Sequence, residues 1–133
     1  DWQAGSGPAV VLGVGGSARA VIAGLSALGA RQIRLVNRTP DRAQILARDL
    51  AVPETEITVH PWEARGAVLE GAAILVNTTS LGMDKEPPLD IDLAALPLAA
   101  VVVDIVYVPL ETGLLAAAHR RALSRAGDGA RHG

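Results

Sequence analysis

The sequence predicts a three-layer α/β/α domain, in which helices cover both faces of a parallel sheet of about five to six strands. Short aliphatic and β-branched runs alternate with helical patterns along the 133 residues. Two of these runs, 72–76 and 101–106, are apolar at almost every position, as in strands that a parallel sheet buries on both faces. The run at 9–12, the first along the chain, enters a glycine cluster that leads directly into a helix. These observations together favour a single domain with one core.

Strands and helical segments are expected in alternation along the chain. The strands are expected at 9–12, 33–36, 57–59, 72–76 and 101–106. The helical segments are expected at about 17–28, 40–50, 62–69, 93–96 and 113–126. Gly29 is expected to end the first helix as its C-cap, and Thr39 followed by Pro40 to begin the second. The expected strand order is 3-2-1-4-5, or 3-2-1-4-5(-6) if a sixth strand follows.

The glycine cluster after the first strand carries a dinucleotide-binding fingerprint. Gly13, Gly15 and Ala18 satisfy the pattern G-x-G-x-x-[G/A]. Gly13 permits the sharp turn, Gly15 lets backbone approach a pyrophosphate, and the small Ala18 allows close packing of helix on strand. The helix then presents its first N–H groups and the positive end of its dipole to the phosphates. An ordinary strand-to-helix turn is the alternative, but the alternating strands and helices favour a Rossmann-like domain.

The residues after the second strand favour NADP over NAD. In domains of this kind a carboxylate at that point accepts hydrogen bonds from the ribose 2′-OH. This chain has Asn37 there, followed by Arg38, with Arg42 one helical turn later. A guanidinium pairs with a 2′-phosphate, and each charge-assisted hydrogen bond contributes about 1.5 to 3 kcal/mol. In the alternative, Thr39 caps a helix and both arginines are solvated surface charges.

Polar and apolar side chains at the ends of the later strands are further candidates. Thr78, Thr79 and Ser80 follow the fourth strand, where hydroxyls meet a pyrophosphate or the nicotinamide ribose. Alternatively, these hydroxyls hydrogen-bond to their own turn. Ile105 and Tyr107 end the fifth strand, where a nicotinamide ring is expected. A separate candidate, Trp62 after the third strand, is expected to cover the core rather than to form a platform for a ligand.

Composition argues against several other classes of protein. The net charge is −2 and the basic residues are scattered, so no nucleic-acid partner is expected. The chain has no cysteine and its three histidines lie far apart in sequence, so no metal site is expected. No apolar run has the length of a membrane span and no signal-like segment opens the chain. A cytoplasmic location without a membrane partner is therefore expected.

Four strings carry a resemblance to a known family. They are GVGGSARA at 13–20, NRT at 37–39, NTTSLGM at 77–83 and DIVYVPLET at 104–112. In this order and spacing they resemble the cofactor domain of the shikimate dehydrogenase family, and the match spans about 9–115. The resemblance implies reversible hydride transfer between NADP and the dehydroshikimate/shikimate pair, a step of aromatic amino-acid biosynthesis.

The resemblance also implies roles for individual residues. The pyrophosphate would be held by Gly13, Val14, Gly15, Gly16, Ser17 and Ala18. The adenosine ribose phosphate would be held by Asn37, Arg38, Thr39 and Arg42. Ile105 would pack at the nicotinamide, where the family often has Met, and Tyr107 would reach the substrate. The family's substrate domain precedes this one and supplies a Lys/Asp pair, so no catalytic residue is expected in this chain, which should bind cofactor without catalysing the reaction.

The ends of the chain are expected to lie outside the folded domain. Residues 1–8 are expected to form a linker, 9–126 the NADP-binding domain and 127–133 a frayed tail. The chain begins without Met and has DGARHG at 128–133, where the family usually has D-G-L-G-M-L, so a piece of a longer protein is expected. The alternatives are a stand-alone, non-catalytic NADP-binding module or another two-domain reductase, such as a quinate dehydrogenase or a glutamyl-tRNA reductase. Oligomeric state is not predicted.

Overall fold

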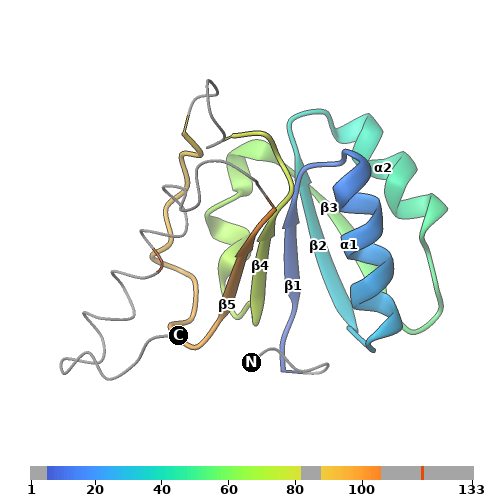
Figure 1. Ribbon diagram of the computed structural model, residues 1–133, viewed down its shortest axis with the longest axis horizontal. Helices are drawn as coiled ribbons and strands as arrows, with labels where there is room; N and C mark the ends of the chain where they lie inside the picture. The colour runs from blue at the N-terminus through green and yellow to red at the C-terminus, as the bar shows by residue number, and fades with distance from the viewer. Residues whose placement is uncertain (1–5, 82–87, 106–117, 119–133) are drawn as a thin grey trace.

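The computed structural model describes residues 6–81, 88–105 and 118, and predictions for other residues lie outside this part of the chain. Five parallel strands form one sheet in the order β3-β2-β1-β4-β5 (Figure 1). They are β1 (Ala9–Leu12), β2 (Gln32–Asn37), β3 (Glu56–Pro61), β4 (Ile74–Asn77) and β5 (Val101–Asp104). The predicted parallel sheet and its strand order are confirmed, while a sixth strand falls outside the described residues.

The register brings the carboxyl ends of the strands to one edge of the sheet. Leu12, the last residue of β1, lies opposite Val36 on β2 and Asn77 on β4. Asn77 in turn lies opposite Asp104 at the end of β5. The chain leaves β1 toward β2 and β3 on one side and later returns to β4 and β5 on the other. The carboxyl ends of the paired strands β1 and β4 therefore mark the switch point at which doubly wound sheets bind ligands.

Two helices cover one face of the sheet (Figure 1). The first, α1 (Gly16–Ala27), turns Ala18, Ile22 and Leu25 into the core at helical spacing. It ends in a Schellman motif, in which the Gly29 N–H donates to the Ser26 carbonyl and the N–H of residue 30 to the carbonyl of residue 25, each at 3.0 Å. The positive φ of +96° at Gly29 allows this ending, so the glycine ends the helix as predicted, although the C-cap residue itself is Leu28.

The second helix on this face is α2 (Pro40–Asp49), which buries Ala43 and Leu46. Thr39 is its N-cap residue as predicted, but the threonine hydroxyl makes no capping hydrogen bond, so the predicted side-chain cap is wrong. The turn is held instead by the Asn37 side chain, whose Nδ2 donates to the Thr39 carbonyl at 3.1 Å. Helix entry here depends on the residue that ends β2 rather than on the threonine.

The other face is covered by two short 3-10 helices, η1 (Trp62–Ala64) and η2 (Ala67–Leu69), and by the segment 88–100. The predicted single helix over 62–69 is wrong. Each turn closes with an i to i+3 bond, from the Arg65 N–H to the Trp62 carbonyl at 3.1 Å and from the Leu69 N–H to the Gly66 carbonyl at 3.3 Å. Gly66, a poor helix former, lies between the two turns and separates them.

The remaining elements agree closely with the predicted ones. The expected turn at 93–96 is present, closed by a bond from the Leu96 N–H to the Leu93 carbonyl at 3.0 Å. Strand β4 begins two residues later than predicted, at Ile74, and the Ala73 N–H before it donates to the Pro8 carbonyl at 2.8 Å. Of the predicted last helix, the structure describes Ala118, which is helical and packs on the second face of the sheet.

Among the described residues, no helix is long and apolar enough to cross a membrane. In the same part of the chain, no three His, Asp or Glu side chains are grouped so that they could hold a metal ion. The cytoplasmic location and the absence of a nucleic-acid partner stay predictions.

Candidate functional site

A cleft of about 330 Å³ opens at the carboxyl edge of the sheet, at the switch point between β1 and β4. It brings together the glycine turn, the end of β2, the start of α2 and the loop after β4, which the sequence places far apart. Its lining residues are Gly13, Val14, Gly15, Asn37, Arg38, Arg42, Trp62, Thr78, Thr79, Ser80 and Leu81. Most of the cofactor-binding residues predicted from the sequence therefore lie in one cavity.

Gly13 forms the floor of this cleft, and the structure requires glycine there. Its φ is +100°, a conformation that side chains with a Cβ rarely adopt. A Cβ at this position would also lie 2.7 Å from the Thr78 hydroxyl oxygen and 3.1 Å from Thr79 Cγ2. The Gly13 N–H donates to the Val36 carbonyl at 2.8 Å, which ties the turn to β2. The sharp turn predicted at Gly13 is confirmed.

Gly15 and Gly16 border open space rather than packed protein. Nothing lies within 4 Å of the Cβ that either residue would carry. Gly15 is the N-cap of α1, whose first turn holds no acidic side chain, so the positive end of the helix dipole is not neutralised there. The first N–H groups of a helix have no partners within the helix. Ala18 is fully buried, as the close packing of α1 on the sheet requires. The pyrophosphate role of this end of the cleft stays a prediction.

The loop after β4 forms the opposite wall and is locked to β1. The Thr78 hydroxyl and the Thr78 N–H both donate to the Leu12 carbonyl, at 2.6 and 2.9 Å. The Thr79 hydroxyl donates to Asn77 Oδ1 at 2.6 Å. Both hydroxyl protons are thus used within the protein, which agrees with the alternative that these residues satisfy their own turn. Their side chains nevertheless line the cleft, and contact with a cofactor stays a prediction.

Asn77 holds this wall in place and was missed as a functional residue. It is fully buried, and its Nδ2 donates to Asp104 Oδ1 at 3.0 Å. Its Oδ1 accepts hydrogen bonds from the Thr79 N–H and the Thr79 hydroxyl. A polar residue ending an apolar strand was the available signal, but its partner on β5 depends on the register of the two strands.

Arg38 and Arg42 stand on the β2 side of the cleft with exposed side chains. No described acidic side chain pairs with either, whereas the ion pairs of the described region use Arg19 and Arg65. Both guanidinium groups therefore remain available to an anion. The same exposure agrees with the alternative of solvated surface charges, and the phosphate role of the two arginines stays a prediction.

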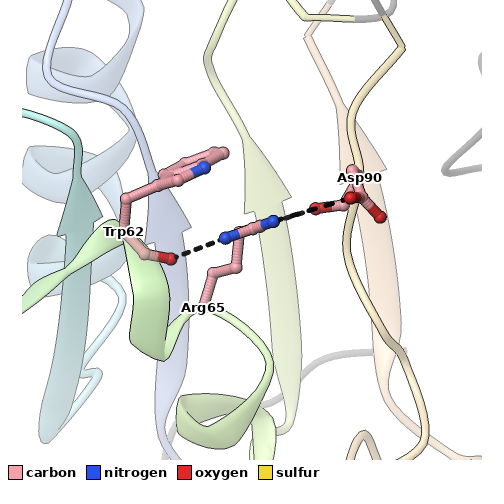
Figure 2. Close-up of polar contacts among 3 residues, drawn as sticks. All are labelled: Trp62, Arg65 and Asp90. Atoms are coloured by element: carbon pink, nitrogen blue, oxygen red, sulfur yellow. Dashed lines mark hydrogen bonds and ion pairs between the residues drawn. The ribbon is translucent and has the colours of Figure 1, made fainter.

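Trp62 occupies two environments in the structure, the core and the cleft, and the sequence predicted the first of them. The half-buried indole packs on the second core cluster, which confirms the prediction that it covers the core. It also lines the cleft, with the Arg38 guanidinium carbon 5.2 Å from the centroid of its ring. Arg65 lies 4.9 Å from the same centroid and donates to the Trp62 carbonyl at 3.0 Å, as Figure 2 shows. The position of Trp62 just after β3 was the signal for its place at this edge.

The other predicted site residues lie outside the cleft. Thr39 is exposed, and Gly16 and Ser17 lie at the start of α1 without lining the cavity. Ile105 follows β5, is 38% exposed, and donates its N–H to the Asn77 carbonyl at 3.0 Å. Tyr107 lies outside the described residues. The nicotinamide and substrate roles of these last two residues stay predictions.

A second hollow, lined by Arg34, His60 and η2, lies on the second face of the sheet. Arg34 Nη1 donates there to the Val68 and Glu70 carbonyls, at 2.6 and 2.7 Å. The His60 ring nitrogen Nε2 lies 2.8 Å from the Thr58 hydroxyl. Burial, with a smaller contribution from the charge of Arg34, lowers the pKa of His60 below its ordinary 6.5. These contacts join η2 to the sheet and have a structural role.

The sequence matches a protein family and curated relatives whose names state an activity. Residues 4–85 match the family described as shikimate/quinate 5-dehydrogenase. A curated relative named shikimate dehydrogenase (NADP(+)) from Paramagnetospirillum magneticum is 56% identical over 120 residues, which are 90% of this chain and 42% of the relative. The protein of the same name from Nitrobacter hamburgensis is 57% identical over 126 residues, 93% of this chain and 42% of the relative.

Solved structures show the same architecture. The quinate dehydrogenase from Corynebacterium glutamicum, solved in complex with NAD, superimposes with a TM-score of 0.81 at 30% sequence identity. The superposition covers 90% of this chain and 43% of that chain. The chain thus spans less than half the length of the relatives and of the structure that it matches.

Proposed function

Because this chain belongs to the shikimate/quinate 5-dehydrogenase family, we propose that it is the cofactor-binding half of an NADP-dependent shikimate dehydrogenase. The observation that carries the proposal is a single cleft that joins the glycine turn to Arg38 and Arg42. The relatives named shikimate dehydrogenase (NADP(+)), at 56% and 57% identity, support both the reaction and the cofactor. The reaction is the reversible reduction of 3-dehydroshikimate to shikimate.

The described residues bind and orient the cofactor. Gly15 and the N-terminus of α1 receive the pyrophosphate, since their backbone is open on the cleft side. Arg38 and Arg42 pair with the 2′-phosphate, which a carboxylate at the end of β2 would repel. When bound there, the cofactor would supply the hydride as NADPH or accept it as NADP+. The wall formed by Thr78 and Thr79 is held rigid by its bonds to β1 and Asn77, so it fixes the position of the bound dinucleotide.

Hydride transfer to a carbonyl also needs a proton donor, and the cleft residues do not include a suitable one. The side chains that line the described cleft belong to Val, Leu, Asn, Arg, Trp, Thr and Ser. None of these types exchanges protons readily near pH 7. We therefore place the donor, a Lys/Asp pair, in the portion of the relatives that this chain does not span.

A quinate dehydrogenase is the second candidate. The TM-score of 0.81 to the Corynebacterium glutamicum enzyme supports it. Sequence identity favours shikimate, at 56% and 57% for the two relatives against 30% for the quinate enzyme.

A chimera tests the proposal directly. This chain would replace the matching 120 residues of the Paramagnetospirillum magneticum enzyme. The chimera should reduce NADP with shikimate as substrate, faster than with quinate and faster than it reduces NAD. The unmodified relative serves as the positive control. A folded chimera that is inactive with shikimate, or that prefers NAD, would contradict the proposal.

A further inference from the structure

Two arginines approach the indole of Trp62, and they differ in how firmly they are held. The guanidinium carbons of Arg38 and Arg65 lie 5.2 and 4.9 Å from the ring centroid, within the range of a cation–π interaction. Arg38 lines the cleft together with Trp62, whereas Arg65 is absent from the cleft lining. The indole therefore links an arginine of the cleft with an arginine of the supporting scaffold.

Arg65 fixes the indole from the side of the scaffold (Figure 2). Its Nη1 donates to the Trp62 carbonyl at 3.0 Å, and its Nε donates to the Asp90 carbonyl at 2.5 Å. Its Nη2 lies 3.9 Å from the Asp90 carboxylate, and the Arg65 side chain is 23% exposed. The ring also packs on the buried cluster of the second sheet face. Trp62 is thus held in place at its backbone carbonyl by Arg65 and at its ring by the core. Arg65 in turn is bonded to the segment that leads to β5.

Arg38 has no comparable anchor within the described part of the chain. The Arg38 side chain is exposed. Among the described residues, the ring of Trp62 is the one group that this side chain contacts in a specific interaction. A free arginine loses rotamer entropy when it pairs with a ligand, and holding it beforehand reduces that loss. A guanidinium stacked on a ring also keeps its in-plane N–H groups free for bidentate pairing with phosphate.

We propose that Trp62 is a positioning residue that presents Arg38 to the 2′-phosphate of NADP and so sets the preference for NADP over NAD. This inference rests on the proposed function, because it needs a 2′-phosphate at the Arg38 side of the cleft. Arg65 contributes indirectly, because it bonds to both Trp62 and Asp90 and so holds the indole in place. Discrimination between the two cofactors then depends on the end of β3 as well as on the end of β2.

The test measures the ratio of NADPH to NADH affinity in two matched variants of the full chain. Trp62→Leu keeps an apolar side chain on the core but removes the aromatic face, and Trp62→Phe keeps both. Trp62→Leu should lower the affinity ratio roughly three- to tenfold, and Trp62→Phe should restore most of it. In an Arg38→Ala background, Trp62→Leu should change the ratio no further, because the group it positions is gone.

The outcomes separate this inference from the proposed function. A wild-type chain that prefers NADPH, with an unchanged ratio in Trp62→Leu, overturns the positioning role and leaves the proposed function standing. A loss of affinity for both cofactors in equal proportion, with the ratio unchanged, shows a merely structural role and also overturns it. A wild-type chain without any preference for NADPH refutes the NADP assignment, and the positioning role falls with it.

Discussion

Replacing Gly13 by alanine should destabilise the fold, whereas the same change at Gly15 should leave stability almost unaltered. At Gly13 the positive φ of +100° costs about 1 to 2 kcal/mol for a residue with a Cβ. The 2.7 Å approach to the Thr78 hydroxyl adds an overlap of about 1 to 3 kcal/mol. Together these costs are about 2 to 5 kcal/mol, a large part of the roughly 5 to 15 kcal/mol that stabilises a typical domain.

Gly15 provides the matched control. Its φ of −75° suits alanine, and a Cβ there meets nothing within 4 Å. The added methyl would instead occupy the space that the pyrophosphate needs, so affinity for NADPH should fall roughly five- to hundredfold.

Thermal unfolding followed by circular dichroism measures the first effect, and titration with NADPH measures the second. At roughly 3 to 5 °C per kcal/mol, Gly13→Ala should lower Tm by about 6 to 25 °C. Gly15→Ala should stay within about 2 °C of the wild type. Equal shifts in Tm for both variants, or full NADPH affinity in Gly15→Ala, would refute this account of the turn.

Three further predictions concern the cleft wall, the arginine and the sheet face. Asn77→Ala should lower the free energy of unfolding by about 2 to 4 kcal/mol in chemical denaturation, since the Thr79 N–H loses its acceptor and Asp104 loses the hydrogen bond from a buried donor; a loss below 1 kcal/mol would contradict this. Arg38→Ala should weaken NADPH binding about tenfold or more and leave NADH binding unchanged, as measured by nicotinamide fluorescence; an equal effect on both cofactors would refute the phosphate role. The folded state lowers the pKa of His60, so the unfolded chain takes up a proton more readily below pH 6.5, and stability should fall as pH decreases from there. In His60→Gln this part of the pH dependence should disappear. Identical profiles of stability against pH in the variant and the wild type would contradict the assignment to His60.

The sequence was most informative where a local pattern determines the structure. The bounds of β1 at Ala9–Leu12 match the predicted 9–12, because an unbroken aliphatic run ends at Gly13. The positive φ at Gly13 and Gly29 follows from the turn and the helix end that surround them. Strand order followed from the chain topology that accompanies the fingerprint. These features depend on neighbours in sequence or on general rules of the fold.

Prediction failed where contacts between distant segments decide the structure. The hydrogen bond between Asn77 and Asp104 depends on the register of two strands 27 residues apart. Trp62 enters the cleft because the ends of β2 and β3 lie side by side, which brings it to Arg38. The 62–69 segment carries a helical pattern, yet it forms two separate 3-10 turns. Thr39 occupies the predicted N-cap position, but the side chain of Asn37 holds the turn.

Titration of the isotope-labelled chain with NADPH and with NADH, followed by NMR, tests the central claim most directly. Amide signals of residues 13–17 and 38–42 should shift with NADPH and saturate together, while those of 58–60 beside the second hollow should not. NADH should shift the 13–17 signals at about tenfold or more higher concentration. Shifts that fall outside the cleft, or equal affinities for the two cofactors, would contradict the assignment of this cleft to NADP.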